Sequence, residues 1–168
     1  MTEAEIVMIV AAIIGGIFIL MILSGIRTVN QGTAVIVQRF GKYNRTLQPG
    51  LRWIFKLTDK ALPPISLKEQ AADFSPQSFA TKDNVTVQIA YTMSFQVVDP
   101  KLFAYGIERP LTAIENLTAS TLRDIFVNLD SNQILSRLHT TSAKVCEVLN
   151  NTTNHWGIQI SRVELRKP

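Results

Sequence analysis

The first clear pattern along the chain is a run at positions 6–26 that has no charged residue and is apolar except for Ser24. As a helix, its 21 residues would span ~32 Å, enough to cross the hydrocarbon core of a bilayer. A cleaved signal peptide begins with basic residues and has a shorter apolar stretch, whereas Glu3 and Glu5 precede this run. We therefore predict a short tail at residues 1–5 and an uncleaved transmembrane helix at residues 6–26, which includes Ile6, Gly15, Gly16, Phe18, Leu23 and Ile26.

Two later segments have the pattern of β-strands. Residues 33–40 are rich in β-branched side chains, and Gly41 and the pair Pro49 and Gly50 interrupt the chain behind them. Residues 85–97 alternate between apolar odd positions and polar or small even positions. A period of two over this length predicts a strand with one buried face.

Beyond Pro110 the apolar residues recur at spacings of three and four, which predicts a helix with one apolar stripe. A second helix is predicted to begin at residues 130–132, where Asp, Ser and Asn are good capping residues, and to run to Trp156, where Gly157 stops it. Residues 158–165 then form a short strand. Its apolar positions change parity after Ile160, which indicates either a bulge or a strand covered on both faces. This order of elements predicts one α+β domain at residues 27–168.

The net charge of +4 is concentrated behind the apolar run, where residues 27–68 hold eight Lys and Arg against one acid. Bases beside a membrane segment tend to stay in the cytoplasm, so we expect a single-pass protein of the plasma or inner membrane with its domain on the cytoplasmic side.

Aromatic residues are mixed with these bases, and the candidates for contact with lipid headgroups are Arg27, Arg52, Trp53, Phe55 and Lys56. A second interpretation remains open, in which Trp53 and Phe55 fill the core beneath the first strands.

No enzyme motif is present, neither a phosphate-binding glycine loop, nor a nucleophile elbow, nor a zinc-protease helix. The single Cys146 lies ~10 Å along the predicted helix from His139, too far for that base to activate it. We therefore predict no catalytic residues, no metal site and no cofactor. Bases interleaved with aromatics also occur in proteins that bind single-stranded nucleic acid, but attachment to a bilayer already explains both features, and we expect no nucleic-acid partner.

A colinear series of short strings extends from Arg39 to Leu165. Its most specific members are Arg39, Phe40, Gly41, Lys42 and Tyr43, then Pro49 and Gly50, then Thr81, Lys82, Asp83, Asn84 and Val85, and finally Trp156 and Gly157. In these strings the chain resembles the stomatin/prohibitin/flotillin (SPFH, or Band 7) superfamily, and most closely its stomatin-like (slipin) branch. Residues 72–77 and 126–129 depart from the family pattern, and we expect the long C-terminal helix of the family to be absent from these 168 residues.

The resemblance implies a domain of antiparallel strands and two helices behind the membrane anchor. It also implies a non-enzymatic scaffold that forms homo-oligomers, organises membrane microdomains and modulates membrane proteases or other membrane proteins. The partners expected on this basis are the lipid bilayer, further copies of the chain, and a membrane-bound ATP-dependent protease or another membrane protein. Two alternatives remain: a lipid-binding module of the membrane surface without a scaffolding role, and a membrane-tethered hydrolase.

Overall fold

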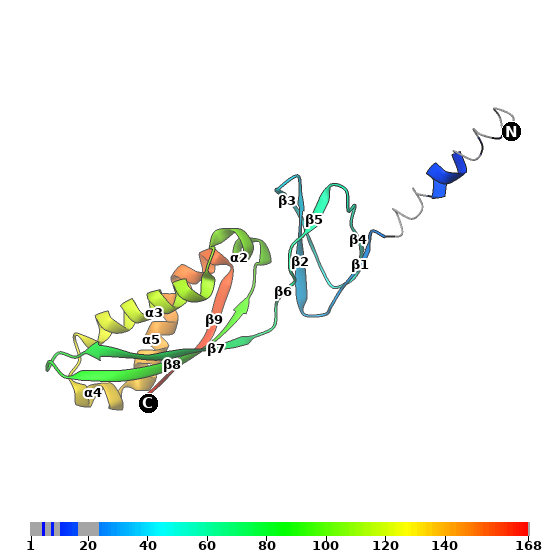
Figure 1. Cartoon of the computed structure of the whole chain (residues 1–168). Helices are drawn as coiled ribbons and strands as arrows, with labels where there is room; N and C mark the ends of the chain where they lie inside the picture. The colour runs from blue at the N-terminus through cyan, green and yellow to red at the C-terminus, as the bar shows by residue number, and fades with distance from the viewer. Residues whose placement is uncertain (1–4, 6–7, 9–10, 17–23, 168) are drawn as a thin grey trace. The chain divides into compact units, whose positions relative to one another are not determined.

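The chain folds as two units in the computed structural model, Met1–Ser66 and Leu67–Pro168, and each is described by itself (Figure 1). The structure describes residues 5, 8, 11–16 and 24–167. Residues 5, 8 and 11–16 are helical, and within the described part of the chain no helix has the length and apolar character needed to cross a membrane. Gly15 and Gly16 belong to this helical stretch, whereas Ile6, Phe18 and Leu23 of the predicted span lie outside the described residues.

The predicted end of the span at Ile26 is wrong, because Ser24 and Gly25 form a turn and Ile26 begins a strand. The Gly25 carbonyl accepts a hydrogen bond from the Ile54 amide at 2.8 Å. A Cβ atom at Gly25 would lie 2.5 Å from the Ile54 carbonyl oxygen. The close approach of these two backbone segments therefore requires glycine and ends any helix before Ile26.

Strands make up the described part of the first unit behind residue 25. They are β1 (Ile26–Val29), β2 (Thr33–Arg39), β3 (Lys42–Leu47), β4 (Gly50–Trp53), β5 (Asp59–Ala61) and β6 (Ile65–Ser66). The strands β1 and β4 form an antiparallel ribbon, while β2 pairs with β3, β5 and β6. The predicted strand at residues 33–40 is thus confirmed, except that it ends one residue earlier. The core of this unit is small and consists of Val29, Val35, Val37, Leu47 and Ile54.

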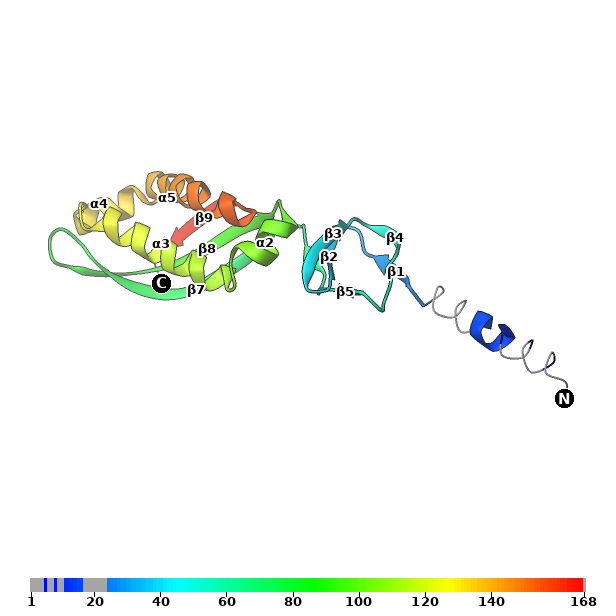
Figure 2. The same ribbon diagram turned by 90° about the horizontal axis from the view of Figure 1, so that it is seen from above.

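The second unit is an antiparallel sheet of β7 (Gln70–Ala80), β8 (Thr86–Val97) and β9 (Ile158–Arg166), in the order β7-β8-β9. Between β8 and β9 lie α2 (Pro100–Gly106), α3 (Pro110–Phe126), α4 (Ser131–Ser136), α5 (Leu138–Thr153) and the 3₁₀ turn η1 (Asn154–Trp156). Figure 2 shows α3 and α5 on the same face of the sheet. The fold is therefore α+β, as predicted, with four α-helices in the second unit where two were expected.

The long alternating segment has one buried face, as its pattern predicted. From Ile89 to Val97 the odd positions of β8 are at most 5% exposed, and they pack in one core with Ile114, Leu122 and Leu149 of the helices. The strand begins at Thr86, however, and Val85, which the pattern included, is exposed in the preceding turn.

The second predicted helix is interrupted at Arg137, whose φ of −113° and ψ of 11° are not helical. The result is α4 and α5 in place of one helix, followed by a 3₁₀ turn that Gly157 ends with a positive φ of 70°. The parity change in β9 is a bulge, because Ser94 pairs with Arg162 while the next residue, Phe95, pairs with Ile160. Ser161 is the extra residue.

The strand β9 is an edge of the sheet, and a side chain occupies part of its outer edge. The Asn150 amide donates to the Ile160 carbonyl at 2.9 Å, and its oxygen accepts from the Ile160 backbone N–H at 2.8 Å. Both backbone groups of Ile160 are therefore satisfied from α5.

Candidate functional site

The ribbon of β1 and β4 has two different faces. Ile26 lies opposite Trp53 and Thr28 opposite Leu51, and residues that alternate in this way share one side of a ribbon. We call these four residues the apolar face of the ribbon. Leu51 is 74% exposed and Trp53 is 45% exposed, so this face is open to water.

On the other face of the ribbon, Arg27 lies directly opposite Arg52, and both are exposed. Like charges at directly opposed positions destabilise a pair of strands. An anion placed between them removes this repulsion. The two faces together suit a boundary between an apolar phase and an anionic one.

The residues that the sequence predicted for lipid contact differ in their exposure to water. Arg27, Arg52 and Lys56 are exposed, Phe55 is half-buried, and the Trp53 and Phe55 rings are in tilted contact with centroids 5.8 Å apart. The buried member of this segment is Ile54, which belongs to the core of the unit. Trp53 therefore does not fill the core beneath the first strands.

The tip of the β2–β3 hairpin adds a further exposed aromatic residue. Phe40 and Gly41 form its two-residue turn with φ angles of 49° and 78°. Turns of this kind match the twist of the strands but require positive φ at both positions, which is unusual for phenylalanine. Phe40 is 80% exposed. Sequence reasoning placed Phe40 in the preceding strand and did not recognise it as a surface residue.

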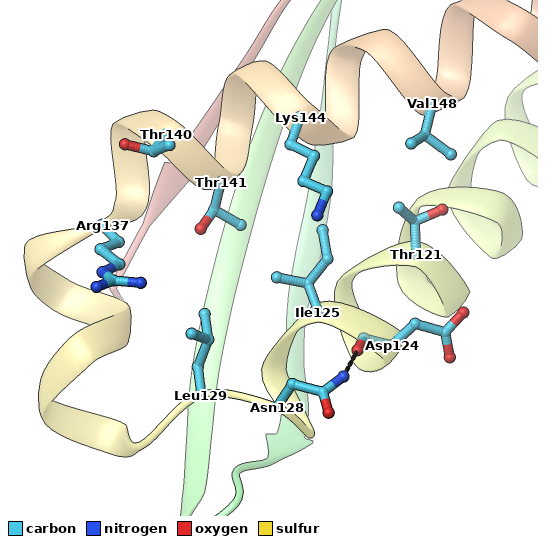
Figure 3. A pocket seen from close by; sticks show the side chains of 10 residues that line it. All are labelled: Thr121, Asp124, Ile125, Asn128, Leu129, Arg137, Thr140, Thr141, Lys144 and Val148. Carbon is cyan, nitrogen blue, oxygen red and sulfur yellow. Dashed lines mark hydrogen bonds between the residues drawn. The ribbon is translucent and has the colours of Figure 1, made fainter.

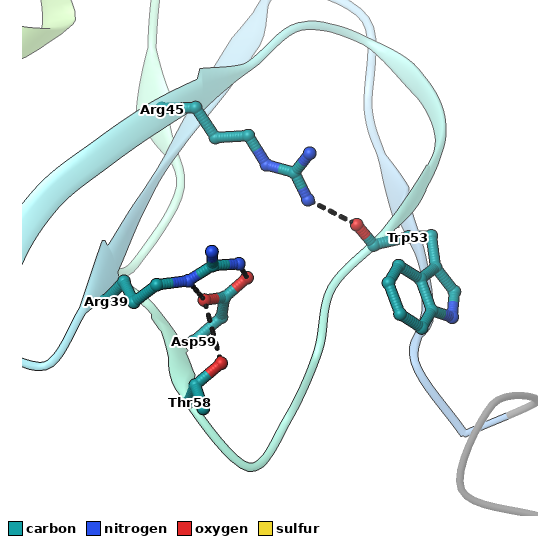
Figure 4. Close-up of polar contacts among 5 residues, drawn as sticks. All are labelled: Arg39, Arg45, Trp53, Thr58 and Asp59. Atoms are coloured by element: carbon teal, nitrogen blue, oxygen red, sulfur yellow. Dashed lines mark hydrogen bonds and ion pairs between the residues drawn. The ribbon is translucent and has the colours of Figure 1, made fainter.

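An ion pair joins the start of β5 to the end of β2 (Figure 4). Arg39 donates to both carboxylate oxygens of Asp59, with N···O distances of 2.7 and 3.2 Å. The Asp59 side chain has no exposed area, whereas that of Arg39 is half exposed. Hydrogen bonds from Arg39 lower the pKa of Asp59, and the carboxylate in turn raises the pKa of Arg39. In the same view, Arg45 donates to the Trp53 carbonyl at 2.6 Å and ties β3 to the end of β4.

In the second unit, the residues from Thr81 to Val85 form the turn between β7 and β8. Asp83 accepts hydrogen bonds from the Ser131 amide and hydroxyl, the latter at 2.7 Å, and the Thr81 hydroxyl also contacts this carboxylate. These bonds lower the pKa of Asp83 to about 2, with the Ser131 hydroxyl as the largest cause. The Lys82 amide donates to the Leu129 carbonyl at 3.0 Å. These family-motif residues join the sheet to the start of α4 and have a structural role.

Trp156 and Gly157 are structural as well. The Gly157 carbonyl accepts hydrogen bonds from the Val98 and Asp99 amides at 2.9 and 3.2 Å. A Cβ atom at Gly157 would lie 2.4 Å from the Asp99 carbonyl oxygen, so glycine is required both for its φ and for this contact. Trp156 packs against the core of the second unit.

The arrangement around Cys146 does not suit nucleophilic catalysis. Its sulfur lies 3.5 Å from the Ile160 carbonyl oxygen, and burial raises the pKa of the thiol. The thiol is therefore protonated at neutral pH and has no activating base among its hydrogen-bond partners. Among the described residues no group of three His, Cys, Asp or Glu side chains is arranged to hold a metal ion.

The sequence profile of the SPFH domain / Band 7 family matches residues 27–168, and the chain belongs to this family. It is 31% identical to human stomatin-like protein 2, mitochondrial, over 138 residues, which cover 82% of the chain and 39% of the relative. An uncharacterized protein of Mycobacterium tuberculosis is 30% identical over 148 residues, or 88% of the chain and 39% of that protein. An uncharacterized protein of Methanothermobacter thermautotrophicus is 33% identical over 132 residues, which cover 79% of the chain and 41% of that protein. The chain thus spans about two fifths of the length of these relatives.

Proposed function

We propose that this protein is a membrane-anchored, non-enzymatic scaffold that acts as an assembly of many copies. The anchor in this proposal is the part of the apolar run from Ile6 that precedes the turn at Ser24 and Gly25, as the pattern of that run predicts. The observation that carries the proposal is the β1–β4 ribbon. It follows the apolar run directly, and it presents an apolar face on one side and two opposed arginines on the other.

The ribbon gains free energy at a membrane surface in two ways. Transfer of Ile26, Leu51 and Trp53 from water to the acyl boundary contributes about 25 cal/mol for each Å² of apolar area. Arg27 and Arg52 gain about 1 kcal/mol each beside anionic headgroups, and the repulsion between them is relieved. Family membership supports the same assignment.

In this proposal the second unit lies on the cytoplasmic side, because the bases are concentrated behind the apolar run. The test is a cysteine placed at the exposed Lys82 in a Cys146→Ser background, probed with a membrane-impermeant thiol reagent. Labelling is expected only after cells are permeabilised. Labelling in intact cells would contradict this orientation.

The assembled copies organise the surrounding bilayer and restrain or recruit membrane proteins, with a membrane-bound ATP-dependent protease as the leading partner class. The test of the scaffold is the size of the full chain, by crosslinking in membranes and by mass determination after mild detergent extraction. A ladder of multiples is expected. A chain that stays monomeric at every crosslinker concentration, yet binds lipid, would identify the alternative: a membrane-surface module without a scaffolding role.

A further inference from the structure

A groove of about 530 Å³ lies between α3 and α5 in the second unit (Figure 3). Small-molecule sites occupy roughly 300–1,000 Å³, so its size suits a small ligand. Ile125 and Leu129 give it an apolar side, and Arg137, Thr141 and Lys144 give it a polar one. The membrane-facing ribbon of the first unit contributes none of these residues.

The two cations of the groove belong to α5 and its N-terminal cap, with Lys144 inside the helix and Arg137 at the cap. Lys144 follows Arg137 by seven residues, about two helical turns or ~10 Å, and Thr141 lies between them on the same face. Figure 3 shows Lys144 reaching across the groove toward Ile125, with Arg137 at the end where α4 meets α5. Neither side chain has a hydrogen-bond or ion-pair partner among the described residues. Both positive charges are therefore available to a ligand.

Thr141 points its hydroxyl into the same groove (Figure 3) although the residue is only 5% exposed. Two other helical threonines, Thr118 and Thr121, donate to carbonyls one turn earlier, at 2.7 and 2.8 Å. The Thr141 hydroxyl has no such bond, and its backbone N–H alone donates to the Arg137 carbonyl. No hydrogen bond to another described residue occupies the Thr141 hydroxyl, so it can donate to a ligand oxygen placed between the cations.

The start of α5 adds to the positive potential of the groove. This helix has no acidic residue in its first turn, and Arg137 makes no side-chain capping bond. The dipole of α5 therefore favours an anion at this end. Asp124 also lines the groove, but in Figure 3 its carboxylate points away from Arg137 and from the end of Lys144.

We propose that this groove binds a phosphate monoester. The phosphate oxygens accept from the Arg137 guanidinium, the Lys144 ammonium and the Thr141 hydroxyl, and the organic part lies on Ile125 and Leu129. Arginine suits this role because its planar fork donates two parallel hydrogen bonds to one phosphate, while lysine acts as a point charge. This site is separate from the proposed scaffold function and does not depend on it.

The test is titration of the full chain in neutral detergent micelles with three probes, followed by amide chemical shifts in NMR spectra and by calorimetry. The probes are inorganic phosphate, glycerol 3-phosphate and the short-chain lipid dihexanoyl phosphatidic acid. Saturable binding is expected, with shifts centred on Thr141 and Lys144. Tighter binding of the lipid would identify a headgroup as the ligand, and equal binding of glycerol 3-phosphate would identify a soluble phosphoester.

Single substitutions separate a specific site from general charge attraction. Arg137→Gln and Lys144→Gln are each expected to weaken binding about tenfold, because each removes a charged donor to the phosphate. Thr141→Val keeps the shape of the side chain and removes the hydroxyl, and a smaller loss is expected. Arg123→Gln, which changes the charge equally on α3 outside the groove, is the matched control and should leave binding unchanged. No saturation with any probe, or an equal loss in the Arg123 variant, would overturn the proposal.

Discussion

The carboxylate of Asp83 caps the start of α4 by accepting hydrogen bonds from both the amide and the hydroxyl of Ser131, a residue 48 positions away in the sequence. Asp130 occupies the capping position itself, but its side chain makes no capping bond. The helix start is therefore fixed by the turn between β7 and β8. This long-range cap connects the end of the sheet to the segment that joins α3 and α4.

The first prediction concerns the acid stability of this cap. Because the pKa of Asp83 falls from 3.8 in the unfolded chain to about 2 in the folded one, its contribution is fully present above about pH 4. That contribution is lost as the pH falls from 3.8 toward 2. In denaturant titrations, Asp83→Asn should lower the stability of the second unit near neutral pH and flatten its pH dependence below pH 4.

Asp130→Asn is the matched control, since it removes a carboxylate at the same helix end without removing a bond. It should leave both the stability and its acid dependence nearly unchanged. Equal effects of the two substitutions would show that the stability of the second unit depends on the negative charge near the helix and not on the hydrogen bonds to Ser131.

The second prediction concerns the ion pair of the first unit. Arg39→Ala should lower the melting temperature by several degrees, because the Asp59 carboxylate is then buried without its partner. The loss should be smaller in the double variant Arg39→Ala with Asp59→Asn, which leaves no buried charge. Arg162→Ala breaks an exposed pair with Glu164 and should have almost no effect on a thermal scan followed by circular dichroism. A similar loss in all three variants would show that burial of Asp59 is not the cause.

The third prediction concerns Gly157. Alanine there would adopt a positive φ, which costs about 1–2 kcal/mol, and its Cβ would clash with the Asp99 carbonyl. Gly157→Ala should therefore lower the free energy of unfolding of the second unit by more than about 2 kcal/mol, measured in urea. Gly106→Ala in the same unit meets its neighbours at an ordinary 3.6 Å and should be tolerated. If the Gly157 variant were as stable as the Gly106 variant, the contact with Asp99 would not constrain the fold.

The fourth prediction concerns the apolar face of the ribbon. In liposomes that contain brominated lipids, a Trp156→Phe variant should show fluorescence quenching, because the proposed function places its remaining Trp53 at the acyl boundary. A Trp53→Phe variant, which keeps only the tryptophan packed on the core of the second unit, should be quenched far less. Adding Leu51→Ser to the Trp156→Phe variant should reduce the quenching without lowering the melting temperature. Equal quenching of both tryptophans would contradict a specific role for the ribbon.

The elements that can be predicted from the sequence are those with one face buried in a core and the other exposed. The alternation of β8 and the apolar stripe of α3 are visible because burial on one side imposes a period on the chain. The parity change in β9 is visible too, but the sequence alone also allowed a strand covered on both faces. By contrast, β7 has little period, since it is an edge strand with most positions exposed and a register shift between Phe74 and Gln77, around Pro76. The strand was therefore missed.

The site is less predictable than the fold, because it depends on pairing between distant residues. The sequence pointed to Arg27, Arg52 and Trp53 as a mixture of cations and aromatics, but their division into two faces follows only from the register of β1 with β4. The break at Arg137 was also missed, since the capping residues at 130–132 and the later stop signal are compatible with one long helix. Arg137, the residue at this break, lines one end of the groove between α3 and α5.

The bond pair between Asn150 and Ile160 also bears on how copies behave when they are crowded. An exposed sheet edge is a template on which another chain can add a strand, and repeated addition leads to aggregates. At one position the Asn150 side-chain amide takes the place of such a strand, since it bonds to both the carbonyl and the N–H of Ile160. These two backbone groups are therefore not available to the strand of a neighbouring chain. Molecules at high local concentration are thus protected at this edge from joining their sheets into a fibre.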